Sequence, residues 1–90
     1  MKDYHRDNST WLRRHKITRA EWDTKLAVQD GHCKICSRTT DLVVDHDHTF
    51  EPGQLDYFRG ILCRQHNVGL GMFRDSEAEL LLALDYLRGH

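Results

Sequence analysis

Features that would assign a class at once are missing from this sequence. No hydrophobic run approaches the roughly 20 residues that a helix needs to span a bilayer. Met1 is followed by polar residues rather than by the apolar core of a signal peptide. The chain has no internal repeat, no low-complexity segment and no sign of a second domain. We therefore expect one soluble, unprocessed domain over residues 1–90, with no membrane partner.

The chain is also too short to build a large hydrophobic core. Ninety residues can bury only a modest apolar core, so a metal or covalent staple is expected. The sequence has three cysteines, which cannot all pair in disulfides, and seven histidines. This composition favours a bound metal and indicates a reducing, cytosolic setting.

A strong net charge is lacking too, but the charges are unevenly distributed. The formal net charge is −1, yet residues 1–19 carry six Lys/Arg against two acids, and residues 20–90 carry seven against twelve. This basic arm contains four positively charged residues, Arg13, Arg14, Lys16 and Arg19, with His15 among them. Such an arm could lie along a nucleic-acid backbone, or it could be a solvated basic segment.

A helix over about residues 18–30 has the clearest local signals. Thr18 and Glu21 form the Thr-x-x-Glu pattern of a capping box. Ile17 and Trp22 occupy the positions of a hydrophobic staple. We expect the inner face of this helix to consist of Trp22, Leu26 and Val28.

The remaining patterns predict a strand pair followed by helices, and so an α+β fold class. A β-branched run at 42–44 predicts a strand, a loop follows at 49–56, and residues 57–62 predict a second, antiparallel strand. A short helix should begin near residue 63 and be interrupted by the glycines at 69 and 71. A final helix over 76–88 should bury a stripe of leucines, Leu80, Leu81, Leu84 and Leu87.

Two ligand pairs predict a structural zinc site. Cys33 and Cys36 are separated by two residues, as are Cys63 and His66. Four such ligands can converge tetrahedrally at about 2.0–2.3 Å from the ion and leave no open position for catalysis. His32 is a local alternative to His66, and cysteines buried as small hydrophobic residues are the alternative to a metal site.

A second constellation lies between and just after these pairs and suits a harder cation. Asp45, at the end of the first strand, and Asn67, in the following helix, could aim side-chain oxygens at one point, as Mg²⁺ prefers. The neutral imidazole of His46 could take a proton from water, which predicts phosphodiester hydrolysis with one metal. Adjacent side chains on a strand point apart, so the chain must turn there if Asp45 and His46 are to face the same phosphate. Surface histidines, a second zinc site or an acidic turn are alternative interpretations of residues 45–48.

In this order the motifs resemble the recombination endonuclease VII family, within the His-Asn-His (ββα-metal) nucleases. The matching segments are Cys33-x2-Cys36, Val44-Asp45-His46-Asp47-His48, Arg59-Gly60-Ile61-Leu62-Cys63, Cys63-x2-His66-Asn67 and Gly69-Leu70-Gly71. The resemblance implies a small zinc-stapled ββα-metal domain flanked by helices. Its knuckle and core would span residues 33–69, with 1–17 as a basic arm or short helix and 76–88 as the C-terminal helix.

Roles for individual residues follow from the same resemblance. It implies that Asp45 and Asn67 bind the catalytic Mg²⁺ or Mn²⁺ and that His46 is the general base. His48 matches a further active-site histidine that orients the substrate or assists the leaving group. Arg59 falls where a phosphate contact is expected, although a surface charge on the strand is an equal alternative. The implied function is a DNA endonuclease of phage or prophage type, acting in the cytoplasm on duplex or branched DNA.

The sequence also departs from the family pattern. His66 stands where the fourth ligand is usually cysteine, and residues 50–55 replace a short glycine-rich turn. The long helical extension through which a family member forms an intertwined dimer is missing. We expect either a monomer that nicks DNA or a weak homodimer formed through residues 80–87.

Two functions without catalysis compete with the nuclease. One is a zinc module that binds nucleic acid through residues 13–19, and the other is a zinc domain that binds protein through its last helix. Neither gives a reason for Asn67 to follow the second ligand pair directly.

Overall fold

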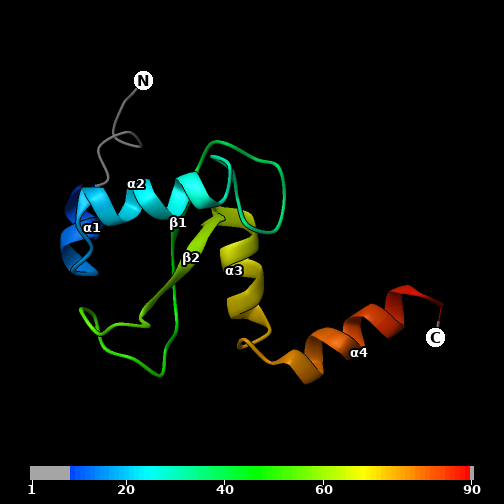
Figure 1. The fold of residues 1–90 in the computed structure, drawn as a ribbon. Coiled ribbons are helices and arrows are strands. Elements are labelled where there is room, and N and C mark those ends of the chain that lie inside the picture. Colours follow the sequence, from blue (N-terminus) through cyan, green and yellow to red (C-terminus); the bar gives the residue numbers. More distant parts are fainter. Residues whose placement is uncertain (1–8, 90) are drawn as a thin grey trace.

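The structure is a computed structural model that describes residues 9–89 of the chain (Figure 1). The elements, in chain order, are α1 (Ser9–Arg14), α2 (Arg19–Val28), β1 (Leu42–His46), β2 (Phe58–Cys63), α3 (Arg64–Met72) and α4 (Glu77–Leu87). This confirms the predicted small α+β fold. Within the described range, no helix has the length and apolar character to cross a membrane.

The two strands form an antiparallel sheet with one irregularity. The pairs run from Leu42–Cys63 to Asp45–Gly60 and then, after a shift, to His46–Phe58. Arg59 is the extra residue in β2 at this shift, which is therefore a β-bulge. A bulge bends its strand and redirects side chains. The bulge lies in β2, opposite Asp45 and His46, so the turn that the sequence predicted between Asp45 and His46 themselves stays a prediction.

Helix α2 begins as its capping box predicts. The Glu21 N–H donates to the Thr18 hydroxyl at 3.0 Å, and the Thr18 N–H donates to the Glu21 carboxylate at 2.9 Å. Trp22 is buried and Leu26 packs beside it, but Val28 is 73% exposed, so its predicted place in the core is wrong. Val28 is two residues after Leu26, which at about 100° per residue places it on the opposite side of the helix from Leu26.

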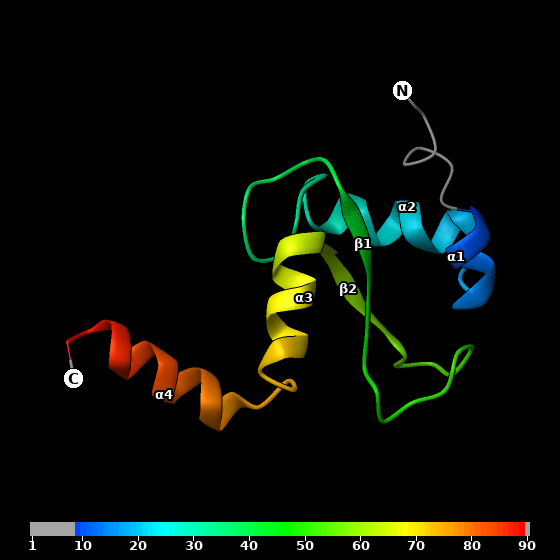
Figure 2. The same cartoon turned by 180° about the vertical axis from the view of Figure 1, so that it is seen from behind.

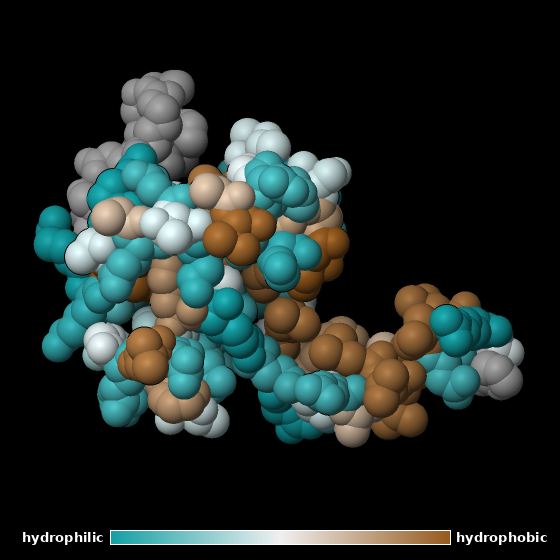
Figure 3. All heavy atoms as spheres, in the orientation of Figure 1, coloured by the Kyte–Doolittle hydropathy of each residue, from teal (hydrophilic) through white to brown (hydrophobic). Residues whose placement is uncertain are grey.

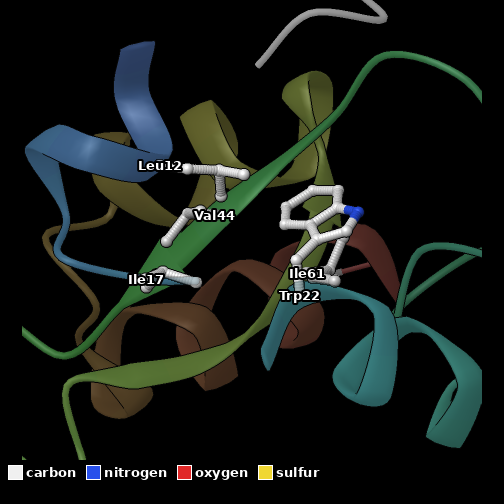
Figure 4. Close-up of a cluster of buried hydrophobic side chains, with 5 residues drawn as sticks. All are labelled: Leu12, Ile17, Trp22, Val44 and Ile61. Carbon is white, nitrogen blue, oxygen red and sulfur yellow. The ribbon is translucent and has the colours of Figure 1, made fainter. Parts of the chain in front are cut away.

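The main core lies between α1, α2 and the strands. Figure 4 shows its five buried members, Leu12, Ile17, Trp22, Val44 and Ile61. A second buried cluster joins Cys33, Leu62 and Cys63, with Leu70 of α3 packed against it. Ile61 and Leu62, which are adjacent in β2, therefore belong to different clusters, so both faces of this strand are buried.

Gln29 ties the end of α2 to β2. Its side chain is buried, donates to the Ile61 carbonyl at 2.9 Å and accepts from the Ile61 N–H at 3.0 Å. It also donates to the His32 carbonyl at 2.9 Å. The amide thus satisfies backbone groups of β2 as a neighbouring strand would.

Helix α3 runs without a break through both glycines, so the predicted interruption is wrong. Glycine costs a helix only about 1 kcal/mol relative to alanine, which packing of the helix can offset. Leu70 supplies such packing between the two glycines. The helix ends instead at Met72, and Arg74 and Asp75 just beyond it both have positive φ angles.

Helix α4 projects from the rest of the molecule (Figures 1 and 2). Its predicted cap is present, since Ser76 accepts from the Glu79 N–H at 3.1 Å. The predicted burial of its leucine stripe is wrong: Leu81, Leu84 and Leu87 are exposed and Leu80 is half-buried. Figure 3 shows these apolar side chains along the projecting helix. The strands and the first three helices fill both core clusters, and the turn at residues 74–75 directs α4 away from them.

Candidate active site and zinc centre

The four predicted zinc ligands come together in the structure. One ligand atom from each of Cys33, Cys36, Cys63 and His66 lies within 4.8 Å of the others. The sulfurs of Cys36 and Cys63 are 3.9 Å apart, and Nδ1 of His66 lies 3.4 Å from the Cys63 sulfur and 3.9 Å from that of Cys33. Separations of this size suit the corners of a tetrahedron around one ion at bond lengths of about 2.0–2.3 Å.

The surroundings of the cluster favour thiolate over thiol. Burial raises the pKa of the Cys33 thiol, but hydrogen bonds from backbone N–H groups and from His66 outweigh it and lower this pKa to about 6. Arg38 lies at the open side, with Nη1 at 3.5 Å from the Cys36 sulfur and 3.7 Å from the Cys63 sulfur. Thiolates are the form that binds a metal.

His32 does not take part in this group. Its Nδ1 lies 2.6 Å from the Cys33 carbonyl and 2.9 Å from the Cys36 carbonyl, so it braces the backbone of the knuckle. Of the two histidines, His66 is the one that the structure groups with the three sulfurs. Because the ligands come from the knuckle and from the junction of β2 with α3, a zinc ion held by them would link separate segments of the fold.

Asp45 is a buried carboxylate that already has a cationic partner. Its side chain is 10% exposed, and Arg59 donates Nε to Oδ2 at 2.7 Å and Nη2 to Oδ1 at 3.0 Å. The same Nη2 donates to Asp75 at 3.1 Å. Hydrogen bonds to Asp45 raise the pKa of Arg59 and so favour its charged form. The site thus requires positive charge beside Asp45, and the bulge in β2 supplies it.

His46 follows Asp45 and is surrounded by aromatic rings. The Tyr57 ring is stacked on it, with centroids 4.8 Å apart and planes 18° apart. His48 makes an edge contact at 4.5 Å, and His15 lies at 5.2 Å. Burial lowers the pKa of His46, and the charge of His48 lowers it further. A neutral imidazole, the form that accepts a proton, is thereby favoured near pH 7.

The other residues of the predicted site have different surroundings. His48 is exposed, whereas Asn67 is half-buried in α3, the helix that packs against both strands. Asp47 accepts from the N–H and hydroxyl of Thr49 at 2.9 and 2.6 Å, and these bonds lower its pKa. Asp47 thus stabilises the turn after β1. For this one residue, the structure agrees with the interpretation of residues 45–48 as an acidic turn.

The four predicted cations of the basic arm are exposed, whereas residues 1–8 of that arm lie outside the described residues. Arg13 and Arg14 end α1, Lys16 lies in the turn that follows, and Arg19 begins α2 with an ion pair to Asp23 at 3.5 Å. His15, in the same arm, instead points into the structure. Its Nδ1 lies 2.5 Å from the Tyr57 hydroxyl, and burial and the charges of His46 and Arg14 lower its pKa.

Three residues near the site escaped the sequence patterns. Tyr57 and His15 are 42 residues apart, and Asp75 follows Arg59 by 16 residues. None of them belongs to a spacing motif, and the only hint was the position of His15 among four cations.

Comparison with known proteins agrees with the motifs. The chain matches the family described as recombination endonuclease VII over residues 8–89, which is nearly its whole length. No curated protein and no solved structure matches it. The matched range contains both ligand pairs, the strand pair and the helix that carries Asn67. The chain therefore belongs to the recombination endonuclease VII family and is a DNA endonuclease.

Proposed function

We propose that this endonuclease is of the His-Asn-His (ββα-metal) type and hydrolyses phosphodiester bonds of DNA with one divalent cation and a histidine base. Asp45 and Asn67 hold the cation, Mg²⁺ or Mn²⁺, and His46 takes the proton from water. The observation that carries the proposal is the environment of Asp45 and His46 at the C-terminal end of β1. There a buried carboxylate that requires a cation adjoins a histidine whose pKa is lowered.

The donor atoms suit a hard cation. Asp45 offers a carboxylate and Asn67 an amide oxygen, and both are ligand types of magnesium. The pairing with Arg59 supports the assignment, because the largely buried carboxylate of Asp45 already binds one positively charged group. A bound cation would stabilise charge on the phosphate oxygens and on the leaving group. At least one oxygen of Asp45 must then be released by Arg59, which becomes available to a phosphate.

The histidines take the proton-transfer roles. His46 is half-buried and favours the neutral form, so it can accept a proton from the attacking water. His48 touches the His46 ring by its edge and is exposed, a position from which it can contact substrate. We assign His48 to orienting the substrate or assisting the leaving group.

The zinc ion has a structural role in this proposal. Three thiolates and one imidazole complete its coordination and leave no open position for water or phosphate. We also propose that the enzyme acts in a reducing cytoplasm, as a phage or prophage protein, because these ligands must stay reduced.

DNA contact is assigned to the exposed basic arm, with Arg59 as an additional contact. Arg13, Arg14, Lys16 and Arg19 can pair with phosphates of duplex or branched DNA. The competing function is a zinc module that binds nucleic acid through the same arm without cleaving it. Both functions predict binding that weakens with salt, so only cleavage separates them.

The experiment is cleavage of supercoiled plasmid with Mg²⁺ or Mn²⁺ by the wild type and by His46→Ala. Zinc content and thermal unfolding of both proteins are measured first. Loss of a general base costs about 100-fold to 10,000-fold in rate, so we expect cleavage by the wild type alone. Cleavage of equal rate by a folded, zinc-loaded His46→Ala protein would remove His46 from the base role. Tight, salt-sensitive binding of plasmid and of a four-way junction, without cleavage of either, would favour the binding module.

A further inference from the structure

The ring of Tyr57 stacks on the imidazole of His46, the proposed general base. Tyr57 is 4% exposed, and its ring lies nearly parallel to that of His46 at 4.8 Å. His46 is the last residue of β1, where the pairing is irregular, so the strand ladder alone fixes its side chain weakly. Stacking on a buried ring restricts the rotation of the imidazole and defines the direction of its nitrogens.

Tyr57 is itself fixed at three points. Its carbonyl accepts from the Asp47 N–H at 2.9 Å, and its own N–H donates to the Gln54 carbonyl at 3.1 Å. Its hydroxyl shares a hydrogen bond with Nδ1 of His15 at 2.5 Å. The first two contacts hold the backbone, whereas the third holds the far end of the ring.

His15 connects Tyr57 to the basic arm. It lies between the exposed cations Arg14 and Lys16 in the turn from α1 to α2, and its ring contacts those of Tyr57 and His46. A DNA backbone bound to Arg14 and Lys16 would therefore lie against the segment that carries His15.

We propose that Tyr57 is a positioning residue for His46, and that His15 fixes Tyr57 from the basic arm, so that the DNA-contacting arm sets the orientation of the general base. The proposal rests on the role of His46 proposed above. It needs no further charge or proton transfer, because stacking and one hydrogen bond are sufficient. Reaction rates are sensitive to such orientation, since a misplacement of about 1 Å can cost about 100-fold.

The test uses three substitutions and one control in the full chain. Tyr57→Phe and His15→Ala remove the same hydrogen bond, and Tyr57→Leu also removes the stacked ring. Tyr86→Phe makes the same chemical change as Tyr57→Phe at an exposed position on α4 and serves as the matched control. Zinc content and the unfolding temperature are recorded for each protein. Cleavage of a duplex oligonucleotide at saturating Mg²⁺ then gives kcat and KM separately.

We expect Tyr57→Phe and His15→Ala each to lower kcat by about tenfold, with KM changed less than about twofold, as expected for loss of orientation rather than of binding. The double variant Tyr57→Phe/His15→Ala should be no slower than His15→Ala alone, because His15→Ala already removes the hydrogen bond that Tyr57→Phe removes. Tyr57→Leu should lower kcat by about 100-fold. Tyr86→Phe should match the wild type.

A second readout does not depend on cleavage. The Cε1–Hε1 NMR signal of His46, identified by its absence in His46→Ala, is displaced by the ring current of Tyr57. We expect this signal to move in Tyr57→Leu and to broaden or move in His15→Ala. Wild-type kcat together with an unmoved His46 signal in folded Tyr57→Phe and His15→Ala proteins would overturn the inference, even if Tyr57→Leu failed to fold.

The two proposals fail in different ways. A wild type that does not cleave, or a His46→Ala protein that cleaves equally well, overturns the role of His46. An active wild type and inactive His46→Ala, with hydrogen-bond variants that behave as wild type, overturn the role of Tyr57 and His15 alone.

Discussion

The Cys₃His group and the carboxylate of Asp45 balance their charges in opposite ways. In the Cys₃His group, four donors converge within 4.8 Å, and the only cation described beside the sulfurs is the exposed Arg38. At the edge of β1, by contrast, both oxygens of Asp45 are already bonded to Arg59. The first site needs a metal to balance its thiolates, whereas the second has an internal counter-ion. This difference underlies two parts of the proposal, namely that zinc is part of the fold and that the catalytic cation binds reversibly in exchange for Arg59.

The largest effect is expected from loss of a zinc ligand. Cys36→Ser should unfold the domain, because zinc binding contributes on the order of 10–16 kcal/mol and a small domain is stable by only about 5–15 kcal/mol. Circular dichroism and zinc content measure this directly. Ser37→Ala, an exposed neighbour in the same knuckle, is the control and should remain folded with its zinc. A stable, zinc-free Cys36→Ser protein would show that the apolar core suffices.

Asn67→Ala should affect the second site and leave the first unchanged. We expect the Mg²⁺ concentration for half-maximal cleavage to rise at least about tenfold, with no loss of zinc, because one ligand of the catalytic cation is removed. A Mg²⁺ titration of cleavage measures the shift. The same half-maximal concentration in variant and wild type would remove Asn67 from the metal site.

Arg59→Gln tests the internal counter-ion. Without Mg²⁺ it should destabilise the protein by on the order of 1–3 kcal/mol, because the buried Asp45 carboxylate loses its partner while Arg59 itself is partly exposed. Mg²⁺ should then raise the unfolding temperature of the variant more than that of the wild type. Arg64→Gln removes the exposed ion pair with Asp41 and is the matched control, with a small effect that Mg²⁺ does not change. Equal responses of Arg59→Gln and wild type to Mg²⁺ would argue against exchange at Asp45.

The smallest effect is expected far from both sites. Leu81→Ser and Leu87→Ser lie on the exposed surface of α4 and should each change stability by no more than about 0.5 kcal/mol. Neither should alter zinc content. Thermal unfolding at two protein concentrations would check this. A large, concentration-dependent loss of stability would show instead that α4 is covered by a second copy.

The comparison also explains which parts the sequence could predict. The zinc ligands lie in two short pairs whose spacing is itself the signal, so the structure confirmed their grouping. Asp45 and His46 are likewise adjacent in one short motif, and their roles stay predictions. The capping residues Thr18 and Ser76 act on backbone groups three residues away, and both are present as predicted.

Contacts across the chain were beyond this kind of inference. Arg59 was expected at a phosphate, and its actual partners, Asp45 and Asp75, lie 14 and 16 residues away. The contact of His15 with Tyr57 spans 42 residues and has no spacing rule. For α4, amphipathic spacing predicts an apolar face but cannot say whether another element covers it. The exposed leucines show that nothing in the described part of the chain does so fully.

The most direct test of two unlike cation sites is a metal inventory coupled to cleavage. The wild type is passed through a desalting column in buffer without divalent cations, its metals are measured by mass spectrometry, and plasmid cleavage is followed before and after Mg²⁺ is added. We expect about one zinc per chain to remain, as four protein ligands require. Cleavage should be absent until Mg²⁺ or Mn²⁺ is supplied. Full cleavage by the zinc-only protein, or Mg²⁺-dependent cleavage by a folded protein without zinc, would contradict the division into a structural and an exchangeable site.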